Sequence, residues 1–391
     1  MEPTDQEGPG ALVAGRYKLL SLAGEGGMAE VWSAEITGAE GFRKRVALKR
    51  IHSHLAHSET YRAMFVREAR LAAELDHPNV VQVFDLGEDS RGLFLVMEWV
   101  QGVTLKDIAE LCDAYGVRLT PALSAALVIE VLRGLEAAHG HHVWEDDGAR
   151  RHSPIIHRDV SPSNVLLTVS GGVKLADFGL ARALDSAGLT PDGIVKGKLA
   201  YMAPELLRGT PATPQSDLFS VGVLLWEVFC GRRRYAGMKE GEIVQALVRG
   251  DPPAPIESLN PDVPEALRAV VTRAVAPDPA QRFPSASAFA RTLSDILRRI
   301  PERTDATRIH REVTTAMEAL RKLRAKQGQA AAGVSALRAP TAPPNLLRGR
   351  TVPPVGGGSA QAAPPSDSAD PLEDRASIAI PLVQGSPRKD D

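Results

Sequence analysis

The sequence predicts an α+β protein with two lobes, a small lobe rich in β-strands followed by a larger, mainly helical lobe. In residues 17–100, short apolar runs rich in Val, Leu and Phe alternate with turns that contain glycine, a pattern typical of strands. In residues 101–300, long segments with apolar residues at helical spacing predominate, the clearest of which are 123–138 and 217–229. The chain therefore changes from strands to helices near residue 100.

Length and composition allow one substantial domain with additional segments, because single domains mostly run to about 100–250 residues and the chain has 391. The 46 basic and 48 acidic residues nearly cancel, so bulk charge does not favour nucleic acid or an anionic membrane as a partner. Cys112 and Cys230 lie far apart, which fits a reducing compartment. Residues 1–10 lack the apolar core of a signal peptide, and no apolar run reaches the ~20 residues of a membrane span. We therefore expect a cytoplasmic protein.

One helix is expected within the strand-rich lobe. Residues 60–75 carry apolar side chains at helical spacing, and His77-Pro78-Asn79 ends the helix, because proline and asparagine favour turns. The apolar runs 80–84 and 93–96 follow it and are expected to be strands.

The segments outside the two lobes differ from them in composition. Residues 1–16 are expected to be flexible. Within 301–327, apolar residues from 309 to 323 recur at alternating four- and three-residue steps, which predicts an amphipathic helix that either packs on the large lobe or forms a weak homodimer contact. Residues 328–391 are rich in Ala, Pro, Gly and Ser and are expected to be disordered. The apolar island 378–383 is either a docking peptide for a partner or an unused part of the tail.

A glycine-rich segment lies between two strand-like runs and reads Gly24-Glu25-Gly26-Gly27-Met28-Ala29-Glu30-Val31. Glycine lets the backbone approach phosphates closely and point N–H donors at them. Ala29 stands at a third glycine position and is small enough for a similar turn. By itself the segment is equally compatible with a plain glycine-rich hairpin turn.

Two charged residues that follow strengthen the phosphate-binding interpretation. The run Val46-Ala47-Leu48-Lys49 places a cation at the end of an expected strand, where Lys49 can grip the α- and β-phosphates of a nucleotide. Glu68, in the next helix, is the candidate partner that holds Lys49 in position. Taken singly, each residue would be interpreted as an exposed charge.

The chemistry is expected on the loop His157-Arg158-Asp159-Val160-Ser161-Pro162-Ser163-Asn164, which sets a carboxylate and a carboxamide five positions apart. Asp159 can orient an acceptor hydroxyl and take its proton, while Asn164 can hold a metal ion that neutralises the migrating phosphate. Asp177, which opens Asp177-Phe178-Gly179 after a strand-like run, can chelate Mg²⁺ between the β- and γ-phosphates. Ala203-Pro204-Glu205 closes a loop without periodicity.

In this order and spacing, the motifs in residues 17–300 resemble the signature set of the eukaryotic-like protein kinase domain, and their forms resemble its bacterial members. The resemblance implies a small lobe over 17–100 and a large lobe over 101–300, with ATP in the cleft between them. It places Met97 at the gatekeeper position and makes Glu98 to Val100 the hinge that holds adenine.

The resemblance also implies an activity and two structural residues. It implies an ATP- and Mg²⁺-dependent enzyme that phosphorylates Ser and Thr hydroxyls of protein substrates and autophosphorylates, in bacterial signalling. Asp217 matches a buried aspartate that braces the catalytic loop, and Arg282 matches an arginine that pairs with Glu205. One alternative is a weakly active or inactive scaffold that acts through binding. Another is a small-molecule kinase, although the segment ending in Ala-Pro-Glu favours a protein substrate.

Two departures from the family pattern fall in one region. The lysine that typically follows the catalytic aspartate by two residues is Ser161, and the threonine typically seven residues before Glu205 is Lys198. We hypothesise that Lys198 supplies the positive charge missing at Ser161. The alternative is that Lys198 is solvated and the enzyme works without it.

The variant Lys198→Met tests this hypothesis. Turnover is expected to fall about a hundredfold if ~2.7 kcal/mol of transition-state stabilisation is lost with the charge. Steady-state kinetics measure the change, and turnover equal to that of the wild type would contradict the hypothesis.

Regulation by phosphorylation is a further expectation. In the family, an arginine at the position of Arg158 reads a phosphate on the activation loop, and Ser186 and Thr190 are the nearby hydroxyls. A phosphate there would add about −1.5 to −2 charges and could order the loop by pairing with Arg158. The alternative is that neither hydroxyl is modified.

Two histidine clusters, residues 52–57 and 139–142, lack accompanying cysteines at zinc-site spacing and are interpreted as solvated loop histidines. Residues 144–152 predict a hairpin before the catalytic loop, which is interpreted as a surface turn rather than a substrate contact.

Overall fold

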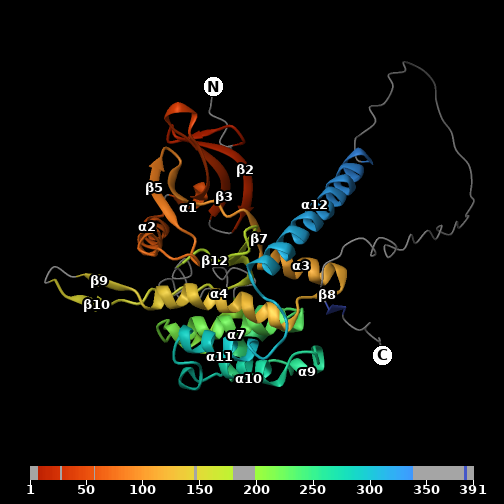
Figure 1. Cartoon of the computed structure of the whole chain (residues 1–391). Coiled ribbons are helices and arrows are strands. Elements are labelled where there is room, and N and C mark those ends of the chain that lie inside the picture. Colours follow the sequence, from red (N-terminus) through yellow and green to blue (C-terminus); the bar gives the residue numbers. More distant parts are fainter. Residues whose placement is uncertain are drawn as a thin grey trace, which may run out of the picture.

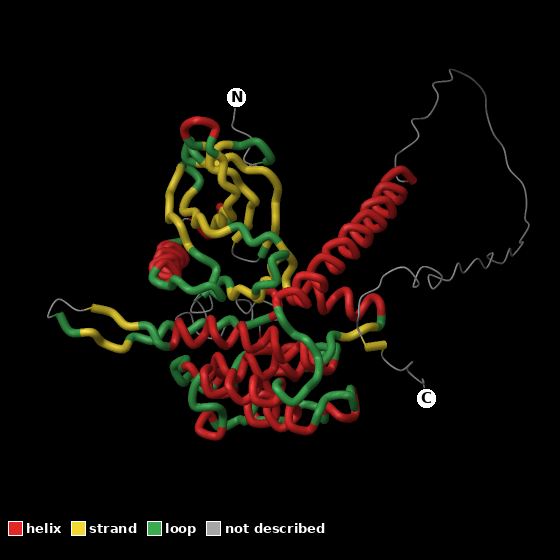
Figure 2. The backbone as a smooth tube through the Cα atoms, in the orientation of Figure 1, coloured by secondary structure: helices red, strands yellow, loops and turns green. Residues whose placement is uncertain are grey.

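The computed structural model describes residues 8–26, 29–56, 58–144, 148–178, 199–337 and 383–384. Figure 1 shows a strand-rich lobe beside a larger helical lobe, with the chain passing from the first to the second after strand β6. The tube in Figure 2 makes the same division visible by element type. The structure confirms the expected α+β, two-lobed class.

The small lobe is a six-stranded antiparallel sheet in the order β1-β2-β3-β4-β6-β5. Its strands are β1 Leu12–Val13, β2 Tyr17–Glu25, β3 Ala29–Thr37, β4 Arg43–Ile51, β5 Val83–Asp89 and β6 Gly92–Glu98. A short 3-10 turn, η1 Ala39–Gly41, joins β3 to β4, and helices α1 Ser53–Ala56 and α2 Glu59–Ala73 follow β4.

Side-chain alternation in the sheet explains where its two cores form. Phe94 and Val96 of β6 face one core, whereas Leu93 and Leu95 face the other, beneath helix α2. Successive strand residues point to opposite faces, so one strand supplies both cores. The second core fixes α2 against the sheet through Phe65 and related apolar residues.

The large lobe contains helices, short turns and small sheets. Its helices are α3 Leu105–Tyr115, α4 Pro121–His139, α6 Pro204–Leu207, α7 Pro214–Cys230, α8 Glu240–Arg249, α9 Ile256–Leu259, α10 Glu265–Ala274, α11 Ala286–Leu297 and α12 Ala306–Leu337, with 3-10 turns η2 Pro162–Asn164, η4 Leu199–Tyr201 and η5 Pro279–Gln281. Its strands are β7 Gly102–Thr104, β8 Val117–Arg118, β9 His142–Trp144, β10 Arg150–His152, β11 Val165–Thr168, β12 Val173–Leu175 and β13 Val383–Gln384.

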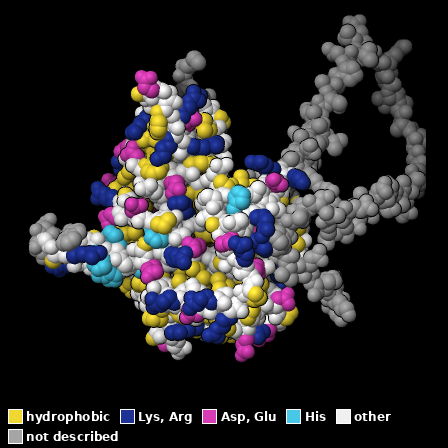
Figure 3. All heavy atoms as spheres, viewed as in Figure 1, with side chains coloured by type: hydrophobic (Ala, Val, Ile, Leu, Met, Phe, Trp, Pro, Cys, Tyr) yellow, Lys and Arg dark blue, Asp and Glu magenta, His cyan; other side chains and the backbone are white. Residues whose placement is uncertain are grey.

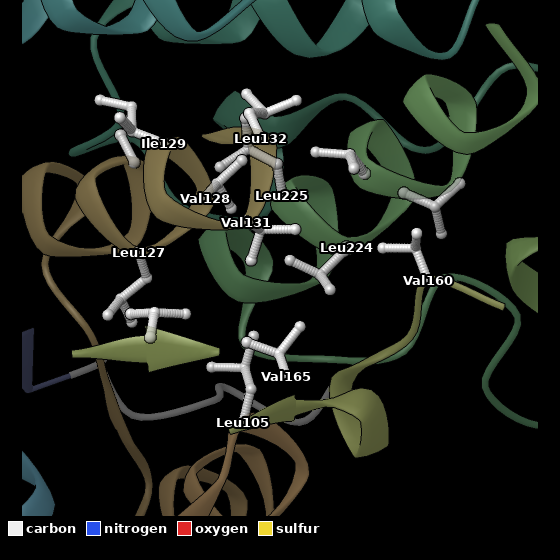
Figure 4. Close-up of a cluster of buried hydrophobic side chains, with 14 of the residues drawn as sticks. Leu105, Leu127, Val128, Ile129, Val131, Leu132, Val160, Val165, Leu224 and Leu225 are labelled. Carbon is white, nitrogen blue, oxygen red and sulfur yellow. The ribbon is translucent and has the colours of Figure 1, made fainter. Parts of the chain in front are cut away.

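Helices α4 and α7 form the centre of the large lobe. Both are apolar around most of their circumference, which is typical of a helix surrounded by protein. Figure 4 shows side chains of both helices, such as Leu132 and Leu224, in one cluster with Val160 and Val165. Val160 and Val165 flank the segment that carries Ser161 to Asn164, so the central core directly supports that loop.

A three-stranded sheet, in the order β12-β11-β7, lies beside the junction of the lobes. Strand β11 begins directly after Asn164, and β12 ends two residues before Asp177. The amide of Ala176 donates to the carbonyl of Asn164 at 2.9 Å, which extends the pairing of these two strands. The hairpin of β11 and β12 therefore brings Asn164 and Asp177 to the same end of its two strands.

Helix α12 packs on the large lobe with its apolar face. Ile309, Val313, Ala316 and Leu320 are buried in the main core, and the helix contacts α3, β7 and β11. This is the lobe-packing alternative of the sequence interpretation. The helix continues to Leu337, past the expected limit of 327, and this extension includes an alanine run with high helix propensity.

The C-terminal region is described only in part. Strand β13 pairs antiparallel with β8, with Val383 opposite Arg118, while residues 378–382 of the apolar island lie outside the described residues. Among the residues that the structure describes, no helix is long and apolar enough to cross a membrane.

Candidate active site

A large open cleft lies between the two lobes. Its upper side is formed by Gly24, Gly26 and Val31 of the small lobe, and its lower side by the segment from Arg158 to Asn164. Lys49 and Asp177 line the same cleft. The structure therefore places Lys49, Asp159, Asn164 and Asp177 around one cleft.

Lys49 is buried, with 3% of its surface exposed, and its ammonium group lies between two carboxylates. Its Nζ atom is 2.7 Å from Oδ1 of Asp177 and 3.7 Å from Oε1 of Glu68. Burial by itself lowers the pKa of Lys49, but the carboxylates of Asp177 and Glu68 outweigh burial and raise that pKa above its usual value. Lys49 is therefore a fixed positive charge at the back of the cleft.

Asp159 and Asn164 are joined by hydrogen bonds across their loop. Nδ2 of Asn164 donates to Oδ2 of Asp159 at 2.9 Å and to the Asp159 carbonyl at 2.8 Å. These bonds leave Oδ1 of the Asn164 carboxamide available as an acceptor. The loop therefore presents a carboxylate and an amide oxygen in a fixed relation.

Asp217 braces the loop from below. Its carboxylate accepts from the backbone amides of His157 and Arg158, both at 2.8 Å, and lies 2.8 Å from Nε2 of His139. Arg158 has φ 67°, in the left-handed region that a non-glycine residue adopts only when the surroundings impose it. The two hydrogen bonds that these backbone amides donate to the buried carboxylate of Asp217 supply that constraint.

His157 connects the loop to the Asp177 segment. Its Nε2 lies 3.0 Å from the Ala176 carbonyl, its Nδ1 lies 3.2 Å from the Asp159 amide, and its ring packs on Phe178 at 4.4 Å between centroids. Because one partner accepts and the other donates, the neutral ring satisfies both. Burial lowers the pKa of His157 and so favours the same neutral form.

An apolar cluster lies between the lobes next to these charges. Buried Ala47, Val81 and Met97 form it together with half-buried Val31, Trp99, Val100, Leu166 and Ala176. The cluster has apolar side chains from strands of both lobes, an apolar surface that suits contact with a flat ring. The side chain of Glu98 pairs with Lys174 at 2.9 Å, and its amide donates to Gln82, so neither group is available to such a ring.

Several predicted site residues lie outside the described residues. They are Gly27, Met28, Ser186, Thr190 and Lys198. Ser161 is described and buried beside Asp159.

Two interpretations of histidines need correction. His139 is not a solvated loop residue: it ends helix α4, is buried, and binds Asp217. The apolar spacing of α4, in which Leu132 and Leu135 precede His139 on one face, could have indicated its inward position. The side chain of His141 is only 14% exposed, and it contacts Glu74 after α2.

Comparison with known proteins agrees with the geometry of the cleft. Residues 17–294 match the family described as the protein kinase domain. The chain is 38% identical over 283 residues to the tyrosine-protein kinase MasK of Myxococcus xanthus, covering 72% of this chain and 43% of MasK. It is 34% identical over 277 residues to the serine/threonine-protein kinase PrkC of Bacillus subtilis, covering 71% of this chain and 40% of PrkC. It thus spans less than half of either relative.

A solved structure resembles the fold. The crystal structure of the Mycobacterium tuberculosis PknI kinase domain superimposes with a TM-score of 0.56 at 28% identity, covering 74% of this chain and 98% of the PknI chain. The similarity therefore extends over nearly the whole of that domain.

Proposed function

The chain belongs to the protein kinase family, and from that premise we propose that it transfers the γ-phosphoryl group of ATP to Ser and Thr hydroxyls of protein substrates, itself included, in bacterial signalling. One observation carries the proposal. Lys49, Glu68 and Asp177 form a single charged cluster facing the loop of Asp159 and Asn164. A cleft of this kind has a place for a triphosphate, a metal ion and an acceptor hydroxyl.

ATP binding is assigned to both lobes. The glycine-rich segment from Gly24 to Ala29 covers the phosphates, and Lys49 holds the α- and β-phosphates because it is a buried cation fixed by Glu68. Adenine is assigned to the apolar cluster that contains Ala47 and Met97, and to the hinge at Glu98 to Val100. The carbonyl of Glu98 and the amide and carbonyl of Val100 are the groups assigned to the ring edge.

Mg²⁺ is assigned to Asn164 and Asp177. Their side-chain oxygens suit this ion, which prefers oxygen ligands and usually takes the remainder from phosphates and water. When bound, the ion neutralises the charge that develops on the transferring group. Asn164 precedes β11 and Asp177 follows β12, and these two strands pair, so a carboxamide and a carboxylate are supplied at the same end of the pair.

Asp159 is assigned to the acceptor hydroxyl. Its carboxylate is held by Asn164 and can orient the hydroxyl and accept its proton during transfer. Lys198 is proposed to supply the charge missing at Ser161, and Ser186 and Thr190 are proposed as autophosphorylation sites.

Phosphoamino acid analysis tests the proposed function. The chain is incubated with radiolabelled ATP, Mg²⁺ and a generic protein, and phosphoserine and phosphothreonine are expected. Phosphotyrosine is the second candidate product, because the relative MasK is named a tyrosine kinase. Absence of all three products with Mg²⁺ and with Mn²⁺ would favour the binding scaffold, which the complete charged cluster argues against.

The proposed organisation of the chain is a kinase domain over 17–300 with helix α12 docked on it as far as Leu320. A cytoplasmic location is proposed because Cys112 and Cys230 are both free thiols. A partner that docks on residues 378–383, and a weak homodimer, are retained as proposals.

A further inference from the structure

A two-stranded hairpin, β9–β10, extends away from the large lobe between α4 and the catalytic loop (Figures 1 and 2). Its strands pair with His152 opposite His142. Figure 3 shows histidine and basic side chains gathered on this projection and where it joins the body. The base of the hairpin, in contrast, contacts segments that adjoin the active site.

His141, at the base of the hairpin, makes two polar contacts. Its Nδ1 atom lies 3.1 Å from the carbonyl oxygen of Ser153, and its Nε2 atom lies 3.1 Å from Oε2 of Glu74. The amide of Ser153 in turn donates to the carbonyl of His141 at 3.0 Å, which closes the base. The His141 side chain is 14% exposed, whereas that of Glu74 is 47% exposed.

The chemistry of the two partners determines what the ring must supply. A backbone carbonyl and an ionised carboxylate both accept hydrogen bonds and donate none. A neutral imidazole has one donor nitrogen and one acceptor nitrogen, so it would satisfy only one of them. Only an imidazolium, which donates from both nitrogens, can satisfy both partners at once.

The two partners lie on elements that carry the catalytic groups. Glu74 is the C-cap residue of α2, six positions after Glu68, the partner of Lys49. Two positions after Ser153, Ile155 is buried and its amide donates to the Ala138 carbonyl, and the catalytic loop begins two positions later at His157. His141 therefore connects the end of α2 to the segment entering that loop.

We propose that His141 is a positioning residue, which holds the C-terminal end of α2 against the large lobe and thereby keeps Glu68 directed at Lys49. Apolar contacts support the same junction, because Leu71 and Leu75 pack on the main core. His141 adds directional polar contacts, to the Ser153 carbonyl and the Glu74 carboxylate, that those side chains cannot supply. This inference depends on the proposed kinase function only for the measurement of turnover, not for the measurement of hydrogen exchange.

Four variants test the proposal. His141→Ala removes the ring, His141→Gln replaces it with a side chain that cannot be charged, His141→Arg supplies a cation with several donors, and Glu74→Gln removes the carboxylate. Amide hydrogen exchange over residues 66–74 and kcat/KM for ATP are measured for each. In His141→Ala, His141→Gln and Glu74→Gln we expect about threefold faster exchange and about threefold lower kcat/KM. The effect is expected to be small because Glu74 is 47% exposed, and a partly exposed pair of this kind contributes little free energy.

The arginine variant and a double variant separate positioning from general stability. His141→Arg is expected to stay near wild type in both readouts, and His141→Ala combined with Glu74→Gln to be no worse than either change alone. His142→Ala is the matched control, because the described contacts of His142 stay within the hairpin and the adjoining Gly140. Wild-type exchange in His141→Ala, wild-type behaviour of His141→Gln, or additive losses in the double variant would overturn the proposal. Hydrogen exchange needs no turnover, so its result stands even if no phosphate is transferred.

Discussion

The variant Asp159→Asn is expected to lose phosphoryl transfer while it keeps its fold and its affinity for ATP. Asparagine has nearly the same shape, and its amide oxygen can still accept the hydrogen bond from Nδ2 of Asn164. It cannot accept a proton from a hydroxyl, so turnover is expected to fall by about 10²–10⁴-fold. Transfer from radiolabelled ATP measures turnover, and nucleotide titration followed by fluorescence measures affinity.

The matched control for this variant is Asp262→Asn. It makes the same chemical change at an exposed carboxylate next to α10, so transfer is expected to remain at the wild-type rate. If Asp159→Asn retained more than about a tenth of the wild-type turnover, Asp159 would not be the group that handles the hydroxyl proton.

The lobes could be predicted from sequence because their patterns are local. Alternation within strands such as 93–96, and helical spacing over 123–138, depend on neighbours a few positions apart. The site residues could be predicted from motifs, which are also local patterns, and their roles stay predictions. The structure adds that Asn164 directly precedes β11 and that Asp177 follows β12 by two positions, so the pairing of these strands places both residues at one end of the hairpin.

The sequence could not predict contacts between segments that local patterns do not connect. Lys174 forms an ion pair with Glu98, 76 positions away in the sequence, and this pair engages the carboxylate of the hinge residue. The bond of His139 with Asp217 joins α4 to α7, and the contact of His141 with Glu74 joins the hairpin to α2. A histidine in a polar stretch looks the same whether solvent or a distant carboxylate faces it. Only the packing of the helices decides between the two.

Replacement of Arg282 by Met is expected to destabilise the large lobe by about 3–5 kcal/mol. Both terminal guanidinium nitrogens of Arg282, Nη1 and Nη2, donate to the carboxylate of Glu205 at 2.8 Å, and Arg282 and Glu205 are only 2% and 6% exposed. Removing the cation leaves a buried carboxylate whose remaining described side-chain donor is Ser216, at 2.9 Å. Urea unfolding measures the change.

An exposed ion pair provides the control for this variant. Arg249 and Asp251 form a contact of 2.6 Å at the surface, and Arg249→Met is expected to leave the unfolding midpoint unchanged because water replaces the lost partner. A double variant, Glu205→Leu with Arg282→Met, is expected to be more stable than Arg282→Met alone, since no charge then remains buried. A double variant as unstable as the single one would show that packing of the arginine, rather than its charge, is what matters.

The pH dependence of the same pair has a definite sign. Burial by itself raises the pKa of Glu205, but the hydrogen bonds and charge of Arg282 outweigh burial and hold that pKa below its usual value. A carboxyl group with a lowered pKa in the folded state stabilises the fold above its unfolded pKa, and this contribution disappears as the pH falls through the folded value. The stability difference between wild type and Arg282→Met should therefore be greatest near neutral pH and narrow as the pH falls below ~4.3, where unfolded glutamate takes up its proton. A stability difference that stayed constant across this range would mean that the effect of Arg282 does not depend on the charge of Glu205.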